Sequence, residues 1–333
     1  MPESSERSFS RDEIRANAYA FQQSRVLLTA YELGVFSTID DGQCTSAEIA
    51  GKLGTDARAT DRLLNALCAM ELLTKKGGRF ANTASARQYL SSKSPAYIPS
   101  LMHTVHLWDT WSALTNAVRT GRGAPIGEVN DRGDTWLTSF ISAMHERAAR
   151  QAPQVISQMD LSGITRVLDV GGGSGAYAMA FARAGASIRS TVFDLPNVVP
   201  ITRRYIEKEG LADRVSTSQG DYLRDELGQG YDLVFLSAII HSNSTAENGE
   251  LMRKCARALS AHGKIVLQDF IMDDDRVHPS HGALFALNML VGTDSGDTYT
   301  EAEVRQWLKE AGFTDISRQE TPFGTSQITG VHH

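Results

Sequence analysis

The sequence contains little cysteine and no long apolar run. Its three cysteines, Cys44, Cys68 and Cys255, are far apart and form no CxxC pair, which argues against a disulfide framework and a zinc site. His103 and His106 lack a carboxylate or thiol nearby to complete a ligand set. No apolar stretch approaches the roughly 20 residues that span a bilayer, and the N-terminus MPESSERSFSRDE is polar where a secretory signal is basic and then apolar. We therefore expect a cytoplasmic protein with no membrane segment and no metal.

An excess of positive charge is also lacking. The net charge of -6 disfavours a general nucleic-acid binder, which needs a basic face to neutralise phosphates. Apolar residues make up 41% and charged residues 22%, as in globular proteins. With 333 residues, the chain exceeds the usual domain size of about 100 to 200 residues. These properties predict a protein of two domains whose partner is a small molecule.

The N-terminal third has the pattern of a winged helix. Residues 11–33 carry apolar side chains at helical spacing, so we expect one long helix there, with a kink. Thr45 and Glu48 have the spacing of a capping box, and Asp56 can cap a second short helix. Two short extended runs then flank a Gly-Gly turn in residues 72–83, which is hairpin chemistry. No helix of this region has a basic face, so DNA binding is disfavoured.

The remainder of the chain reads as helical and then as α/β. Residues 100–160 look helical, with Pro125 and Gly127 breaking the middle. From Arg166 onward, strand-like runs alternate with helical ones, which implies a parallel sheet with helices on both faces. We predict three parts: a winged-helix domain at 1–99, a helical connector at 100–160 that contributes to a substrate pocket, and a nucleotide-binding α/β domain at 161–333.

A glycine-rich loop follows the first of these strands. Gly171 and Gly173 lie where the backbone must turn tightly and admit a ligand, and Asp194 lies at the spacing of an acid that holds ribose hydroxyls. The same spacing satisfies the dinucleotide fingerprint. Asp169 favours the other interpretation, because a carboxylate there would repel a diphosphate but attract the ammonium and sulfonium of S-adenosylmethionine. Asp221, after the third strand, is a further acid suited to that cationic cofactor.

Several motifs together resemble one family. They are VLDVGGGSG, VFDLPNVV, GDYL, YDLVFLSAIIHS, ARALSAHGKIVLQDF and YTEAEVRQWLKEAGF. With the winged-helix start, they make nearly the whole chain similar to the plant-type (caffeic acid type) O-methyltransferases and their bacterial relatives that act on small molecules. The resemblance implies a class I methyltransferase domain with a Rossmann-like sheet. It also implies an N-terminal domain used for homodimerisation, a substrate pocket between the two, and S-adenosylhomocysteine as product.

The resemblance and the loop chemistry together assign positions to the two ligands. The residues that we expect to bind the cofactor are Asp169, Gly171, Gly173, Asp194, Leu195, Asp221, Tyr222 and Ser237. Ser237 departs from the family, in which many relatives have a longer polar or basic residue. The residues that we expect to bind the acceptor are Trp108, Phe140, Met144, Met289 and Thr293. Phe140 and Met144 match the family's F-x-x-x-M helix, although any buried helix face would show the same spacing.

A histidine follows the strand YDLVFLSAII. His241 lies at the carboxyl end of that strand, where open α/β sheets bind ligands, and the resemblance implies that it is the catalytic base. The family usually reads His-Asp-Trp-Ser-Asp here, whereas this chain reads HSNST. Asp269 matches the acid that orients the histidine. The family's second acid aligns with Thr298, and the adjacent Asp297 could substitute for it.

The sequence thus predicts O-methylation of a small aromatic, quinone-like or polyketide-type hydroxyl, with His241 as base and Asp269 behind it. Methylation of carbon or nitrogen on the same scaffold is the nearest alternative. A winged-helix regulator that senses a ligand and an NAD-linked oxidoreductase are the alternatives from other classes. Asp169 argues against the oxidoreductase.

Overall fold

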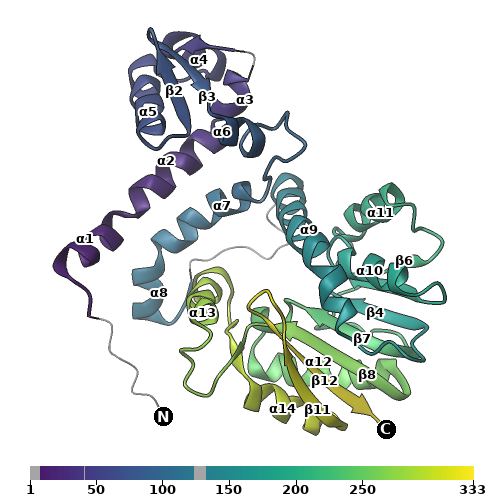
Figure 1. Ribbon diagram of the computed structural model, residues 1–333. Coiled ribbons are helices and arrows are strands. Elements are labelled where there is room, and N and C mark those ends of the chain that lie inside the picture. The colour runs from purple at the N-terminus through teal and green to yellow at the C-terminus, as the bar shows by residue number, and fades with distance from the viewer. Residues whose placement is uncertain (1–7, 41, 124–132) are drawn as a thin grey trace. The chain divides into compact units, whose positions relative to one another are not determined.

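The computed structural model describes residues 8–40, 42–123 and 133–333. The chain forms two compact units that meet in sequence between His106 and Leu107 (Figure 1). The division into 1–99, 100–160 and 161–333 stays a prediction. The helix break expected at Pro125 and Gly127 lies outside the described residues, as does the start of the N-terminal arm.

The first unit is mainly helical. Its elements are α1 (Arg11–Tyr19), α2 (Phe21–Glu32), α3 (Val35–Ile39), β1 (Cys44–Thr45), α4 (Ser46–Leu53), α5 (Ala57–Ala69), β2 (Leu73–Lys76), β3 (Arg79–Asn82), α6 (Ala84–Tyr89) and the first half of α7 (Leu101–Ser112). The strands pair antiparallel in the order β1-β3-β2.

The local signals read from the sequence explain these elements. The Thr45 side chain accepts a hydrogen bond from the Glu48 backbone N–H, and the Glu48 carboxylate accepts one from the Thr45 N–H, so the capping box begins α4. Asp56 caps α5 by accepting from the backbone N–H of Ala59. The predicted order of helix, helix and hairpin is confirmed. The long helix expected over 11–33 is divided at Ala20, whose φ of -56° and ψ of -29° are still helical, so the interruption is small.

The second unit is α/β. Its helices are the rest of α7, then α8 (Leu114–Thr120), α9 (Asp134–Ser157), α10 (Ala176–Ala184), α11 (Val199–Lys208), a 3₁₀ turn (Ile240–Ser242), α12 (Thr245–Ala258), α13 (Ser280–Gly292) and α14 (Glu301–Glu310). Its strands are β4 (Arg166–Val170), β5 (Arg189–Asp194), β6 (Val215–Gln219), β7 (Tyr231–Ser237), β8 (Leu259–Asp269), β9 (Ile271–Met272), β10 (Tyr299–Thr300), β11 (Phe313–Glu320) and β12 (Ser326–His332).

Seven of these strands form one sheet in the order β11-β12-β8-β7-β4-β5-β6. β4 to β8 pair in parallel, as the alternating pattern predicts. Beyond these predicted strands, β12 pairs antiparallel with β8, and β11 antiparallel with β12. Two antiparallel strands can follow each other through a tight turn, so β11 and β12 need no crossover helix between them. The fold is the mixed, Rossmann-like sheet of class I methyltransferases.

Both faces of the sheet are covered by helices (Figure 1). Alternation along β4 sends Val167 to one face, where it packs with α9 and α10, and Leu168 and Val170 to the other, where they pack with α12 and α14. The parallel strands therefore end at one common edge. That edge carries the glycine loop, the loop with Asp221 and Tyr222, and the turn with His241.

Candidate active site

The glycine loop at the end of β4 requires residues without a side chain. Gly171 has a φ of +64°, and a Cβ there would lie 2.3 Å from Cδ1 of Ile239. At Gly172 a Cβ would lie 2.6 Å from Oδ2 of Asp169. The Gly171 N–H donates to the carbonyl of Phe193 at 2.8 Å, which ties the loop to β5. The loop thus forms a bare stretch of backbone that a ligand can approach closely.

Two carboxylates surround this loop. Asp169 is buried and accepts a hydrogen bond from the backbone N–H of Ala178 at 3.1 Å, in the first turn of α10. Asp194 accepts from the backbone N–H groups of Gly173 at 2.7 Å and Leu195 at 2.8 Å. Burial raises the pKa of Asp169 to about 7 and that of Asp194 to about 6, and no basic side chain in the described ranges pairs with either. Within these ranges, the two carboxylates therefore have no basic side chain that compensates their charge.

A cationic ligand would supply a compensating charge. This is the test of fit for S-adenosylmethionine: glycines leave room for the ligand backbone, and buried acids with raised pKa values gain from a nearby sulfonium and ammonium. The residues present fit that cofactor. A dinucleotide diphosphate would add negative charge to the same place.

The loop after β6 carries Asp221 and Tyr222. Asp221 accepts from the backbone N–H of Leu223 at 2.9 Å and lies 3.3 Å from the Arg224 guanidinium, so part of its role is to close its own turn. Lys254 is buried and donates to the carbonyl of Tyr222 at 3.0 Å. The Gly171 backbone lies close to the Tyr222 ring, since a Cβ on that glycine would be 3.8 Å from Cε1. The predicted cofactor residues of β4, β5 and β6 thus gather at one edge.

Ser237 ends β7 and forms a hydrogen bond with the hydroxyl of Tyr177, a residue that the sequence analysis did not select. Tyr177 also accepts a hydrogen bond from Nε2 of Gln268 at 2.9 Å. Burial raises the pKa of Tyr177, so the phenol stays neutral. The short side chain of Ser237 leaves no cation at this position, where many relatives have a longer polar or basic one.

His241 and Asp269 come together as expected. His241 lies on the 3₁₀ turn after β7, and its Nδ1 is 2.8 Å from Oδ1 and 2.9 Å from Oδ2 of Asp269, which ends β8. Asp269 also accepts from the backbone N–H of Phe270 at 2.8 Å. The two side chains are 12% and 3% exposed, so water competes little for the pair. The Phe285 ring of α13 meets the imidazole edge-on at 4.8 Å.

The altered loop after His241 is a buried polar network. The Tyr222 hydroxyl donates to Oδ1 of Asn243 at 3.1 Å, and Asn243 donates to Oδ1 of Asn248 at 3.0 Å. Asn248 in turn donates to the carbonyl of Ile240 at 2.8 Å. The sequence signal for this network is the HSNST motif itself, in which an asparagine replaces the family's tryptophan.

The acid suggested beside Thr298 does not reach the imidazole. The Asp297 backbone N–H donates to the carbonyl of His241 at 3.0 Å, but its carboxylate lies 3.5 Å from the Arg276 guanidinium and accepts from the Thr298 N–H at 2.7 Å. The interpretation in which Asp297 substitutes for the second acid therefore finds no support in this geometry. Asp269 is the carboxylate that contacts the ring.

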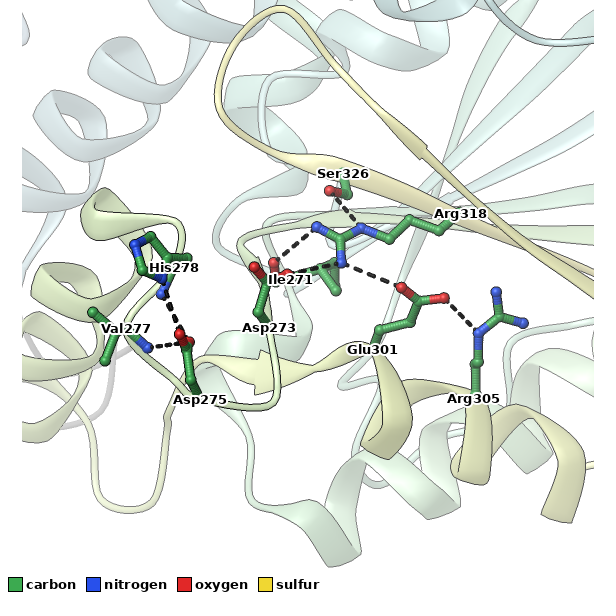
Figure 2. A network of polar contacts seen from close by, with 9 residues as sticks. All are labelled: Ile271, Asp273, Asp275, Val277, His278, Glu301, Arg305, Arg318 and Ser326. Carbon is green, nitrogen blue, oxygen red and sulfur yellow. Dashed lines mark hydrogen bonds and ion pairs between the residues drawn. The ribbon is translucent and has the colours of Figure 1, made fainter. Parts of the chain in front are cut away.

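The segment between β9 and α13 is held by a charged network. Figure 2 shows Arg318 of β11 reaching Asp273 at 3.6 Å and Glu301 at 3.2 Å, while Glu301 also binds Arg305 at 2.6 Å. His278 lies 2.9 Å from Asp275 in the same segment. These contacts hold the segment that leads into α13, the helix whose Phe285 contacts His241.

The predicted acceptor residues lie on three helices of the second unit. Phe140 and Met144 are half-buried on α9, where Phe140 stacks on Trp136 with ring centroids 5.1 Å apart. Met289 is buried on α13, and Trp108 is half-buried on α7. Thr293 has a local role, because its hydroxyl donates to the carbonyl of Met289 at 2.8 Å and accepts from the N–H of Gly296. Sequence reasoning missed Phe285, which contacts His241, and Tyr177, which is bonded to Ser237.

A groove of about 720 Å³ lies between α9 and α10, away from His241. Its lining includes His145, whose Nδ1 is 2.9 Å from the hydroxyl of Ser174 in the glycine loop, and none of the predicted site residues. We assign it no ligand. Within the described residues there is no cluster of histidine, cysteine and acidic side chains that could hold a metal. No helix there is long and apolar enough to cross a membrane.

Comparison with known proteins identifies the family. Residues 111–314 match the O-methyltransferase domain, and residues 17–92 match the O-methyltransferase dimerisation domain. The chain is 33% identical to 3-hydroxy-5-methyl-1-naphthoate 3-O-methyltransferase of Streptomyces sahachiroi, over 93% of this chain and 92% of that protein. The solved structure of PigF with SAH superposes with a TM-score of 0.89 at 26% identity, covering 97% of this chain and all (100%) of that one.

Human N-acetylserotonin methyltransferase in complex with SAM superposes with a TM-score of 0.81 at 26% identity, covering 98% of this chain and 99% of that one. These matches extend over both units, and they agree with the cofactor that the buried acids favour. The chain belongs to the O-methyltransferase family, and it is an S-adenosylmethionine-dependent methyltransferase with the family's dimerisation domain.

Proposed function

We propose that this enzyme methylates a hydroxyl oxygen of a small aromatic, quinone-like or polyketide-type molecule, with His241 as general base. The observation that carries the proposal is the pair of short contacts between His241 Nδ1 and the Asp269 carboxylate. A carboxylate accepts and does not donate, so it places the proton of the neutral imidazole on Nδ1. The lone pair of Nε2 is then free to accept a proton.

A base is useful for this reaction. S-adenosylmethionine, when bound, supplies a methyl group already made electrophilic by the sulfonium. The chain must therefore align the acceptor oxygen and remove its proton. A phenol with a pKa of about 10 is largely neutral near pH 7, so its oxygen is a weak nucleophile until a base accepts the proton. Proton transfer to such a base typically contributes a factor of about 10² to 10⁴.

The acids of the site have a binding role in this proposal. Asp169 and the glycine loop hold the amino-acid end of the cofactor, and Asp194 holds the ribose hydroxyls. Asp221 and Tyr222 lie beside the adenine of the cofactor. The burial of Asp169 and the two backbone donors to Asp194 fix these carboxylates before any ligand arrives. Such fixed groups lower the reorganisation needed during binding.

Apolar and aromatic side chains near His241 support an aromatic acceptor. Phe140 and Met144 on α9 and Met289 on α13 present apolar surface, and Phe285 on α13 lies against His241. The Streptomyces sahachiroi relative acts on a hydroxynaphthoate, a bicyclic aromatic compound. This supports a phenol-like or naphthol-like acceptor for the present chain.

We further propose that the enzyme is a homodimer. The dimerisation domain supports this, and so does α1, which has no buried residue. Ile14, Tyr19 and Phe21 are 58%, 61% and 54% exposed, so three large apolar side chains of α1 and α2 are left uncovered by the described residues.

The function can be tested with methyl-labelled S-adenosylmethionine. The purified enzyme is incubated with a panel of hydroxylated benzenes, naphthalenes and anthraquinones, and the products are located by NMR. We expect the label on oxygen. A label on ring carbon or on nitrogen, with hydroxyl compounds left unmodified, would replace O-methylation by the corresponding alternative.

A further inference from the structure

An arginine lies on the acceptor face of α9. Arg147 follows Phe140 by seven residues and Met144 by three, so all three side chains leave the helix on one side. Its guanidinium carbon is 5.8 Å from the centre of the Phe270 ring, within reach of a cation–π contact.

Aromatic rings connect this cation with the candidate base. The Phe270 and Phe285 rings are 4.9 Å apart, and Phe285 lies 4.8 Å from the His241 imidazole. All of these residues belong to the second unit, and they come from α9, the residue that follows β8, α13 and the turn after β7. A flat molecule with its hydroxyl at His241 would lie along these rings, with its far end toward Arg147.

The charge of Arg147 is not neutralised by a carboxylate within the part of the chain that the structure describes. The neighbouring acid on the helix, Glu146, binds Arg150 at 3.4 Å instead. Burial raises the pKa of Tyr177, and the Arg147 cation acts against that rise, so the guanidinium also lies near the Tyr177 phenol. An exposed arginine can remain simply hydrated, but this one combines an aromatic contact with a position on the side of α9 that carries Phe140 and Met144.

We propose that Arg147 binds a carboxylate of the acceptor, so that the preferred substrates are aromatic compounds bearing both a hydroxyl and a carboxylate. The guanidinium suits this task because it can lie over a ring and still form two parallel hydrogen bonds to a carboxylate. The proposal rests on the proposed function, since it takes the acceptor as the molecule held between α9, Phe285 and His241.

A second carboxylate is present whenever the enzyme works, namely that of the cofactor. Ser237 is uncharged, so it provides no cation for the cofactor carboxylate, and its hydroxyl is bonded to Tyr177. The contact of Arg147 with Phe270, next to Asp269, favours the acceptor. The test must therefore distinguish binding of the acceptor carboxylate by Arg147 from binding of the cofactor carboxylate by the same residue.

The test compares two ligands that differ only in the carboxylate, 3-hydroxy-1-naphthoate and 2-naphthol. Their affinities for the complex with S-adenosylhomocysteine are measured by calorimetry for wild type, Arg147→Gln and Arg147→Lys. Arg150→Gln is the matched control, because it removes the same charge one turn further along α9. We expect Arg147→Gln to weaken the naphthoate by about ten- to a hundredfold, as for loss of a charged hydrogen bond, with 2-naphthol unchanged. Arg147→Lys should recover part of the loss.

Three results would overturn the proposal. They are equal affinities of the wild type for both ligands, an equal loss for both in Arg147→Gln, or a weaker affinity of that variant for S-adenosylhomocysteine alone. The last would assign the cation to the cofactor. An enzyme that binds the naphthoate through Arg147 but methylates no hydroxyl would contradict the proposed function and leave this assignment intact.

Discussion

The hydroxyl of Tyr222 donates a hydrogen bond to the side chain of Asn243, and this bond joins the cofactor loop after β6 to the loop that carries His241. Asn243 is buried and also donates to Asn248, whose own amide holds the carbonyl of Ile240 in the 3₁₀ turn. The position of the candidate base therefore depends on a side chain that also contacts the cofactor loop.

Asn243→Leu should disturb both the cofactor loop after β6 and the turn that carries His241. It removes a donor and an acceptor from partners that remain buried, which typically costs about 1 to 3 kcal/mol in the free energy of unfolding. We also expect kcat to fall more than cofactor affinity, because the His241 turn loses its support. Urea denaturation and steady-state kinetics measure the two effects, with Ser242→Ala, an exposed neighbour, as control. A variant with wild-type stability and kcat would show that the network does not position the turn.

The glycine loop makes a sharper steric prediction. A Cβ at Gly172 would lie 2.6 Å from Asp169 Oδ2, so Gly172→Ala must displace the buried carboxylate. We expect a loss of about 1 to 3 kcal/mol in stability and weaker cofactor binding. Gly51→Ala is the control: it lies in α4 with nothing within 4 Å of its Cβ, and should gain about 0.5 to 1 kcal/mol. Equal effects of the two changes on thermal unfolding would contradict the steric argument.

Cofactor affinity should depend on pH through Asp169 and Asp194. Their pKa values, about 7 and about 6, are raised by burial, so both carboxyls are largely protonated in the free enzyme at low pH. The folded state then holds more protons than the unfolded chain, and stability without ligand falls as pH rises from roughly 4 to 7. A cationic cofactor favours the ionised forms, so its affinity should rise over the upper part of the same window and level off above it.

Calorimetry in buffers of different ionisation heat would count the protons released on binding. Proton release should be larger near pH 6 than near pH 8, and larger for S-adenosylmethionine than for its uncharged-sulfur product. Asp232→Asn is a suitable control, since that carboxylate binds Thr165 at the opposite edge of the sheet and has a lowered pKa despite partial burial. Affinity that falls as pH rises would mean that these acids do not meet a cation.

How much of this could be read from the sequence depends on whether the signal was local. Capping boxes and the hairpin are encoded within a few residues, and they appear where Thr45 and Asp56 predict them. Four of the five parallel strands, β4, β5, β7 and β8, carry buried apolar residues, whereas β6 is mostly polar. β11 was missed because, apart from Phe313, its residues are mostly exposed and polar, as an edge strand permits.

The site residues also divide into those that a local motif signals and those that depend on tertiary packing. His241 and Asp269 followed from motifs at strand ends, because parallel strands bring such ends together. Phe285 and Arg147 carry no motif, and their relevance depends on the tertiary contacts that both make with the ring of Phe270. Asp297 illustrates the opposite error: its sequence position suggested a catalytic acid, but Arg276 holds its carboxylate.

The dimer can be tested through α1. Ile14→Glu places a charge on the exposed apolar face of that helix, where an interface of more than about 2,000 Å² is expected for an obligate pair. Light scattering at micromolar concentration should show a dimer for the wild type and a smaller species for the variant. Lys76→Glu, on the exposed hairpin, should remain dimeric. A monomeric wild type would refute the homodimer.

The most direct test of the mechanism changes the base and the acid behind it. His241→Gln keeps a polar side chain but accepts no proton, so kcat should fall by about 10² to 10⁴ while the affinity for S-adenosylhomocysteine stays the same. Asp269→Asn should lose less, because the imidazole remains present although its tautomer and orientation are no longer fixed. Acceptors of lower phenol pKa separate the two roles: they need less help from a base, so the deficit of His241→Gln should shrink as the acceptor becomes more acidic. A deficit that is constant across such a series would assign His241 to binding, and turnover at the wild-type rate would remove it from the mechanism.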